Sequence, residues 1–366
     1  MQVYNTTPCR FLVFLLFVIL VVLPGCTTPS MSHGADSGER LRYIDCHNHL
    51  FGGSPTAGRG VMNYPGAARS AVTKMDELDI SSMIVMPPPI SPENSGSFSL
   101  DGFLDAINRY PDRFAFLAGG ESLNVMIHQT ARDYNVGKEI RAAFMKKALK
   151  ILEEGAIGFG EFAVEHFSFN FNHPYESVRA DHPLFLMLSD IAAEHRVPVD
   201  IHMEAIPRDM PLPDRMILLR SQRNPQFLRE NIKAFERLLS HNRDAKIIWA
   251  HVGWCNTGYR TPELCGEMMK RHPNLYMSFK LSRESVHETR PLKKGRQNIK
   301  PEWLRLIRKF PGRFIIGTDQ FYSQPGGRQI GPQKTRDTRI FMDLLPPELA
   351  RKIGIENPKR IFNLGP

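Results

Sequence analysis

Short apolar runs alternate with longer amphipathic segments along most of this chain. Each short run has the length and composition of a strand. Each longer segment places apolar residues at i, i+3 and i+4, the spacing of a helix with one buried face. The strand-like runs cover residues 42–47, 82–86, 114–118, 156–162, 197–203, 246–251, 275–279 and 313–318. The helical segments cover residues 67–78, 100–110, 140–153, 184–195, 225–239, 263–271 and 302–310.

Regular alternation of strand and helix predicts parallel strands joined by crossover helices, which places the chain in the α/β class. Eight such units between residues 41 and 366 predict a single (β/α)8 TIM-barrel domain, with its active site at the C-terminal ends of the strands. A doubly wound open sheet is the alternative. The sequence argues against it, because no G-x-G-x-x-G motif follows the first strand.

Residues that commonly bind metal ions stand at the ends of five predicted strands. The first strand ends in Asp45-Cys46-His47-Asn48-His49, and side-chain alternation puts His47 and His49 on one face. One histidine at a strand end is usually structural, but several such residues on one face of a barrel predict a metal centre. The fourth, fifth, sixth and eighth strands end at Glu161, His202, His251 and Asp319.

These motifs resemble the amidohydrolase superfamily, and most closely its amidohydrolase-related (amidohydrolase 2) branch. The resemblance extends from Asp45 to the C-terminus. It is carried by D-x-H-x-H at residues 45–49, A-H-x-G at 250–253, G-T-D at 317–319 and N-x-x-R-x-F at 357–362. That branch contains metal-dependent hydrolases and some decarboxylases. The resemblance therefore implies a TIM barrel that binds one or two divalent metal ions, with zinc as the expected ion.

The resemblance also implies a role for each ligand. His47 and His49 would bind the more buried metal, and His202 would be a further ligand. His251 would either bind a second metal or polarise the substrate. Asp319 would bind the metal and act as general base on its bound water, whose pKa a divalent ion lowers to about 7.

The fourth strand departs from the family pattern. Many two-metal members carry a carboxylated lysine there as a bridge, but this chain has Gly158-Phe159-Gly160-Glu161-Phe162. We expect Glu161 to be a metal ligand that bridges two ions directly. The alternative is a one-metal site in which Glu161 only orients a ligand histidine.

The predicted reaction is hydrolysis of a small-molecule amide, lactone or ester by a metal-activated water. Lys280 after the seventh strand and Arg260 after the sixth are the expected contacts to a substrate carboxylate or phosphate. Three alternatives stay open. They are a metal-dependent decarboxylase on the same scaffold, a phosphodiesterase-like or nuclease-like hydrolase, and a catalytically inactive, lipid-anchored binding module.

The basic residues are spread along the chain, apart from a run at residues 290–296, and give a formal net charge of +9. Because no aromatic residues interleave with them as in a nucleic-acid groove, no nucleic-acid partner is expected. Three long connections, residues 164–183, 204–224 and 281–300, follow strand ends and would overhang the barrel mouth, where long loops shape substrate pockets. The last is strongly polar, and a disordered basic loop is its alternative.

The N-terminus has the pattern of a targeting segment. Arg10 precedes thirteen consecutive apolar residues, 11–23, a run that is short for a membrane span but suits a signal-peptide core. Leu23-Pro24-Gly25-Cys26 resembles a lipoprotein lipobox and predicts a signal peptide at 1–25, a lipid anchor at Cys26 and a flexible tether at 26–40. An uncleaved anchor or plain secretion is the alternative. The expected location is the cell envelope, in the outer membrane or periplasm of a Gram-negative bacterium.

The five cysteines do not form a disulfide framework. Cys9 lies in the signal region and Cys26 is the lipidation candidate. Cys46 is expected to point away from its two histidine neighbours and to act as a small buried hydrophobe. The sequence does not decide whether Cys255 and Cys265 are bridged.

Overall fold

The computed structural model describes residues 40–51, 62–170, 173–218, 221–283, 285–327, 331 and 333–365. Its contacts group Arg40–Pro366 into one unit, separate from Met1–Glu39. The predicted signal peptide and Cys26 lie outside the described residues, so the lipid anchor stays a prediction. Among the described helices, none is both long enough and apolar enough to cross a membrane.

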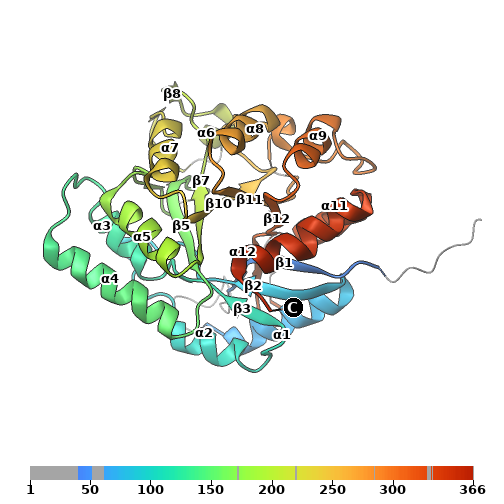
Figure 1. The fold of residues 1–366 in the computed structure, drawn as a ribbon, viewed down its shortest axis with the longest axis horizontal. Helices are drawn as coiled ribbons and strands as arrows, with labels where there is room; N and C mark the ends of the chain where they lie inside the picture. The colour runs from blue at the N-terminus through green and yellow to red at the C-terminus, as the bar shows by residue number, and fades with distance from the viewer. Residues whose placement is uncertain are drawn as a thin grey trace, which may run out of the picture. The chain divides into compact units, whose positions relative to one another are not determined.

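A closed ring of parallel strands lies at the centre of the 40–366 unit (Figure 1). The hydrogen-bonded path runs β3-β2-β1-β12-β11-β10-β7-β5-β4. Only Leu117 separates β3 from β4, so both ends of the path belong to one strand and the sheet closes. The predicted (β/α)8 barrel is confirmed, and each predicted strand overlaps a barrel strand. These strands are β1 (Tyr43–Leu50), β2 (Ile80–Val85), β3 (Phe114–Phe116) with β4 (Ala118–Gly119), β5 (Phe159–His166), β7 (Pro198–Met203), β10 (Lys246–Val252), β11 (Leu275–Phe279) and β12 (Phe314–Ile316).

Helices surround this ring and bury their apolar faces against it (Figure 1). Helix α8, for example, begins where the Thr261 hydroxyl accepts a hydrogen bond from the Leu264 amide and Pro262 occupies the first turn. The helices are α1 (Tyr64–Glu77), α2 (Leu100–Ile107), α3 (Leu123–Gln129), α4 (Lys138–Glu153), α5 (Pro183–Glu194), α6 (Asp214–Leu218), α7 (Ile232–His241), α8 (Pro262–Arg271), α9 (Pro301–Lys309), α10 (Gln333–Leu344), α11 (Pro347–Arg351) and α12 (Asn357–Phe362).

One predicted helix has a wrong boundary. The apolar spacing predicts a helix from residue 225, but α7 begins at Ile232. The preceding residues Phe227–Leu228 form strand β9, which pairs antiparallel with β8 (Met210–Pro211). Backbone hydrogen bonds to a distant segment therefore override the local periodicity.

The barrel interior is filled by a small apolar cluster. Ile84, Ile248 and Ile315 come from three different strands and contact one another through it, together with Ile361 and Phe362 of α12. Helix α12 contains the N-x-x-R-x-F motif. Within it, the Asn357 side chain donates hydrogen bonds to the carbonyls of Pro311 and Phe314, each at 2.8 Å. The motif thus fastens α12 to the start of β12 and brings Phe362 into the interior.

Strand β1 is not a regular strand. Its register against β2 shifts between Asp45 and Asn48, which is a β-bulge. Cys46 is buried in the interior cluster, as a small hydrophobe should be. Because a bulge changes the alternation of side chains, Cys46 can occupy the interior while both neighbouring histidines still reach the mouth. The three described cysteines, Cys46, Cys255 and Cys265, are all free thiols.

The long connections are folded where they are described. Strand β6 (Glu176–Ser177) turns the first back onto β5 as an antiparallel pair. The basic 281–300 loop contains the short helix η2 (His287–Thr289) and an antiparallel bridge between Leu292 and Ile299. Both bridge residues are buried in the main core, so the described part of this loop around them is packed against the barrel.

Candidate metal centre

The six predicted metal-binding side chains converge at the C-terminal ends of the barrel strands. Closure of the ring brings together residues separated by as much as 272 positions in sequence, such as His47 and Asp319, because β12 pairs with β1. All six side chains are buried. His47 and His49 come from β1, Glu161 from β5, His202 from β7, His251 from β10 and Asp319 from the residues after β12.

The Glu161 carboxylate lies at the centre of the group. Its Oε2 atom is 3.6 Å from His47 Nε2 and 3.4 Å from His49 Nε2. Its Oε1 atom is 3.0 Å from His202 Nδ1 and 2.9 Å from His251 Nε2. Each oxygen thus faces two imidazoles, as a bridging ligand between two cation positions would. Asp319 extends the group, with Oδ1 at 3.2 Å from His49 Nε2.

Two of these residues have an unusual backbone. His251 has φ 67° and Asp319 has φ 52°, in the left-handed region that non-glycine residues rarely adopt. Such a conformation costs about 1–2 kcal/mol and is concentrated at functional sites. His251 adopts it within β10, one residue before the strand ends, and Asp319 adopts it three residues after the end of β12.

Asp45 supports the loop that carries Asp319. Its carboxylate accepts hydrogen bonds from the Thr318 amide at 3.0 Å and the Thr318 hydroxyl at 2.7 Å. The Asp319 amide in turn donates to the carbonyl of His47 at 2.8 Å. These hydrogen bonds therefore join the D-x-H-x-H motif of β1 to the G-T-D segment that follows β12.

The donor set fits a divalent metal ion. His49 Nδ1 donates to the Met86 carbonyl at 2.9 Å, which leaves the Nε2 lone pair facing the site. His47 Nδ1 and Nε2, His49 Nε2 and His251 Nδ1 are buried and make no hydrogen bond of regular geometry with described residues, although carboxylate oxygens lie 3.2–3.6 Å from the first three. Buried polar atoms of this kind call for a partner. The ligand atoms of His47, His49 and Glu161 lie within 4.8 Å of one another, and so do those of Glu161, His202 and His251.

The charges of the two carboxyl groups are fixed by their neighbours. Burial on its own would raise the pKa of Glu161, but His47, His202 and His251 outweigh it and hold the pKa well below its usual range. Burial would also raise the pKa of Asp319, but Lys280 and Lys334 outweigh it and lower that pKa strongly. Both groups are therefore anionic at neutral pH, the form that binds a cation.

The pKa values of the histidines in the site are shifted in opposite directions. Burial would lower the pKa of His47, but the carboxylates of Asp200 and Glu161 raise it well above the ordinary value. Burial, reinforced by Lys280, lowers the pKa of His251 well below the ordinary value. His251 is therefore neutral at physiological pH.

Lys280 lies where the sequence placed it, at the end of β11. Its ammonium pairs with Asp319 Oδ2 and lies 3.7 Å from the centre of the Trp254 ring. A buried cation beside the ligands is able to receive an anionic group of a substrate. Its role in substrate binding stays a prediction.

Arg260 requires a correction. Its buried guanidinium donates to the carbonyls of Ala250 and Met203 and stacks on Trp249 at 4.5 Å. The Nη groups of Arg260 thus bind backbone carbonyls adjacent to His202 and His251. Arg260 therefore supports the strand ends that carry these histidines, and these donors are not available to a substrate.

The sequence reasoning missed two residues. Asp200 Oδ1 lies 3.2 Å from His47 Nδ1 and is placed to orient that ring. The signal was available, since Asp200 precedes His202 by two positions on the same face of β7. Lys334 lies 3.5 Å from Asp319 Oδ2 and donates to the Asp319 carbonyl. Only the fold brings this residue of α10 to the mouth.

His166, the last residue of β5, packs its ring 4.3 Å from that of His202. Burial and the neighbouring His202 lower its pKa well below the ordinary value, so it is neutral. It therefore lies against His202 and adds no charge to the site.

Comparison with known proteins agrees with this geometry. The amidohydrolase family model (Amidohydro_2) matches residues 44–364 of the chain. A search of curated proteins found no match to the chain. A solved dihydroxybenzoic acid decarboxylase from Polaromonas sp. JS666, with bound manganese and the inhibitor 2-nitroresorcinol, is 16% identical. The match covers 88% of this chain and 97% of the decarboxylase, with a TM-score of 0.52.

Two further solved structures are similar to this chain. A protein described as amidohydrolase II is 16% identical over 88% of this chain and 99% of its own, with a TM-score of 0.51. A probable 2-pyrone-4,6-dicarboxylic acid hydrolase from Acinetobacter baumannii, with citric acid bound, is 13% identical over 88% and 100%, with a TM-score of 0.47. Because the family model covers nearly the whole barrel, this chain belongs to the amidohydrolase family.

Proposed function

We propose that this chain is a metal-dependent hydrolase that acts on a small-molecule amide, lactone or ester. The observation that supports this most directly is the buried Glu161 carboxylate, which lies within 3.6 Å of four imidazoles at the barrel mouth. Membership of the amidohydrolase family supports it as well. The ion would be divalent. Zinc suits the histidine-rich donor set, and the bound manganese of the Polaromonas structure makes manganese the second ion to test.

The proposed ligands are His47, His49, Glu161, His202 and Asp319, with His251 as a further ligand or as a group that polarises the substrate. A divalent ion bound there would supply Lewis acidity and would lower the pKa of a bound water. Side chains of the protein would transfer the proton and bind the substrate. Asp319 is anionic and accepts a proton, and Lys280 holds an anionic group of the substrate against Trp254.

Asp319→Asn tests the proton-transfer role. The amide keeps an oxygen toward the site but cannot accept the proton, so turnover should fall by about 10²- to 10⁴-fold. Metal content, measured by mass spectrometry of the purified protein, should stay close to that of the parent. Asp190→Asn, on an exposed part of α5, is the matched control. Undiminished turnover in Asp319→Asn would remove Asp319 from this role.

A decarboxylase is the second candidate, and the two lysines at Asp319 favour it. Lys280 and Lys334 place two ammonium groups beside one carboxylate, an arrangement able to hold the carboxylate of a benzoate-like acid. The Polaromonas neighbour is a decarboxylase. A panel of esters, lactones, amides and aromatic acids, followed for both hydrolysis and release of carbon dioxide, separates the two reactions.

A further inference from the structure

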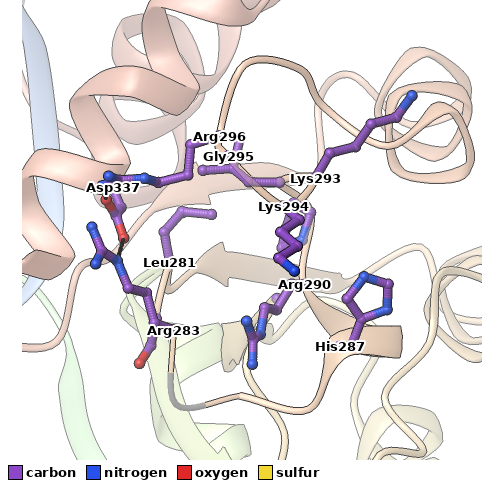
Figure 2. A pocket seen from close by; sticks show the side chains of 13 residues that line it. Leu281, Arg283, His287, Arg290, Lys293, Lys294, Gly295, Arg296 and Asp337 are labelled. Atoms are coloured by element: carbon purple, nitrogen blue, oxygen red, sulfur yellow. Dashed lines mark hydrogen bonds and ion pairs between the residues drawn. The ribbon is translucent and has the colours of Figure 1, made fainter.

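A hollow separate from the metal centre lies under the basic 281–300 loop (Figure 2). Its volume is about 460 Å³, a size that suits a small molecule. Its lining begins at Gly253, two residues after His251, and at Leu281, the residue after Lys280. None of the metal-binding side chains lines it, so it is separate from the metal centre.

The lining of this hollow is strongly basic. The lining residues include five cations and one carboxylate, that of Asp337, and the Lys293 side chain extends away from the others in Figure 2. On one side of the hollow, Asp337 pairs with Arg283 and Arg296 (Figure 2). The remaining permanent cations, Arg290, Lys293 and Lys294, form no ion pair with any described carboxylate.

Arg290 is held with its donors available. Its Nε atom donates to the Ser285 carbonyl at 2.7 Å, which fixes the guanidinium plane. The two Nη groups make no hydrogen bond with described residues, so the fork that matches an oxyanion is still available. Lys294 lies on the same side of the hollow in Figure 2, away from the Asp337 pairs.

The loop that carries these cations is rigidly attached. The Ser285 hydroxyl accepts from the Cys255 amide at 3.0 Å and bonds the Thr289 hydroxyl at 2.7 Å. Gly253 has φ 88°, and a Cβ there would lie 2.8 Å from Pro291 Cγ, so only glycine allows the loop to approach this closely. The backbone around Arg290 is therefore held in place before any ligand binds, which lowers the entropic cost of binding.

We infer that this hollow, with Arg290 and Lys294 as its anion-binding cations, is a binding site for a small molecule with a phosphate-type oxyanion of two or more negative charges. The two unpaired cations, Arg290 and Lys294, exceed what a single carboxylate would neutralise, and arginine with lysine is a usual pairing for phosphate. A polynucleotide is the poorer fit, because the lining contains no phenylalanine, tyrosine or tryptophan on which successive bases could stack.

Protection of lysines from an acylating reagent locates the binding. Inorganic phosphate, added to the purified chain, should slow acylation of Lys294 at least threefold, as measured by peptide mass spectrometry. Lys309, exposed on α9 and outside the lining, is the internal reference and should not change. Acetate at the same ionic strength should protect neither lysine. Equal protection of both lysines, or equal protection by acetate, overturns the inference.

Calorimetry with inorganic phosphate gives the affinity. Arg290→Gln combined with Lys294→Gln should weaken phosphate binding at least tenfold, and Lys294→Gln alone should weaken it by a smaller factor while leaving the Arg290–Ser285 bond in place. Arg308→Gln, which removes an exposed charge of α9, should leave the affinity unchanged. An Arg308→Gln variant that weakens binding as much as the double variant shows a general charge effect and refutes the site. The readouts need no turnover, so they stand whether or not the proposed hydrolase activity is found.

Discussion

Substitution of Glu161 by glutamine is the sharpest test of the metal centre. The carboxylate faces four imidazole nitrogens at 2.9–3.6 Å, and glutamine keeps its shape while it removes one negative charge. A unit charge at roughly 4 Å from a cation, at an effective dielectric constant of about 20, contributes about 4 kcal/mol. If Glu161 binds the metal directly, its affinity should therefore fall by about a factor of 10³. If Glu161 only orients a histidine, the loss should be about 10- to 100-fold.

Competition with a chromophoric chelator measures this affinity, and mass spectrometry gives the number of ions per chain. The matched control is Glu176→Gln. Glu176 is also buried, but burial raises its pKa to about 8, so at neutral pH it is largely protonated and glutamine resembles its native form. We expect the control to bind metal like the parent. Metal affinity within about tenfold of the parent in Glu161→Gln would refute its role as a ligand.

Three other predictions concern stability. Arg260→Lys should cost about 2–4 kcal/mol in urea unfolding, because lysine cannot make both buried hydrogen bonds and stack on Trp249; a loss below about 0.5 kcal/mol would contradict the support role. Gly253→Ala should cost about 2 kcal/mol or more, from the positive φ and the contact with Pro291, and should speed proteolysis of the 281–300 loop; unchanged cleavage would argue against tight docking. Burial lowers the pKa of His128 from 6.5 to about 4, so the folded state binds fewer protons than the unfolded state between these values, and this group makes stability fall by about 3 kcal/mol as pH drops from 6.5 to 4. His128→Gln should flatten that part of the urea-stability profile, and an unchanged slope would count against it.

The sequence by itself indicated the eight strands of the barrel and the polar residues that lie at or just beyond their C-terminal ends. A period of 2 or 3.6 is a local property, and eight alternating units allow few other arrangements than a closed barrel. The motifs at residues 45–49, 250–253 and 317–319 then placed His47, His251 and Asp319 at one end of it. The sequence also showed that residues 290–296 are basic, although it left open whether the 281–300 loop is ordered.

Only the tertiary structure decided where side chains point and what they contact. The bulge in β1, the left-handed backbone at His251 and the pairing of β9 with β8 all depend on distant neighbours, which local periodicity does not contain. Arg260 illustrates the consequence: the sequence shows a cation after a strand, but the fold directs its donors to backbone carbonyls. Conversely, Lys334 carries no local signal and reaches Asp319 only through the packing of α10. The chemistry of a site depends on distances of a few ångströms, and these are set by contacts between elements that are remote in sequence.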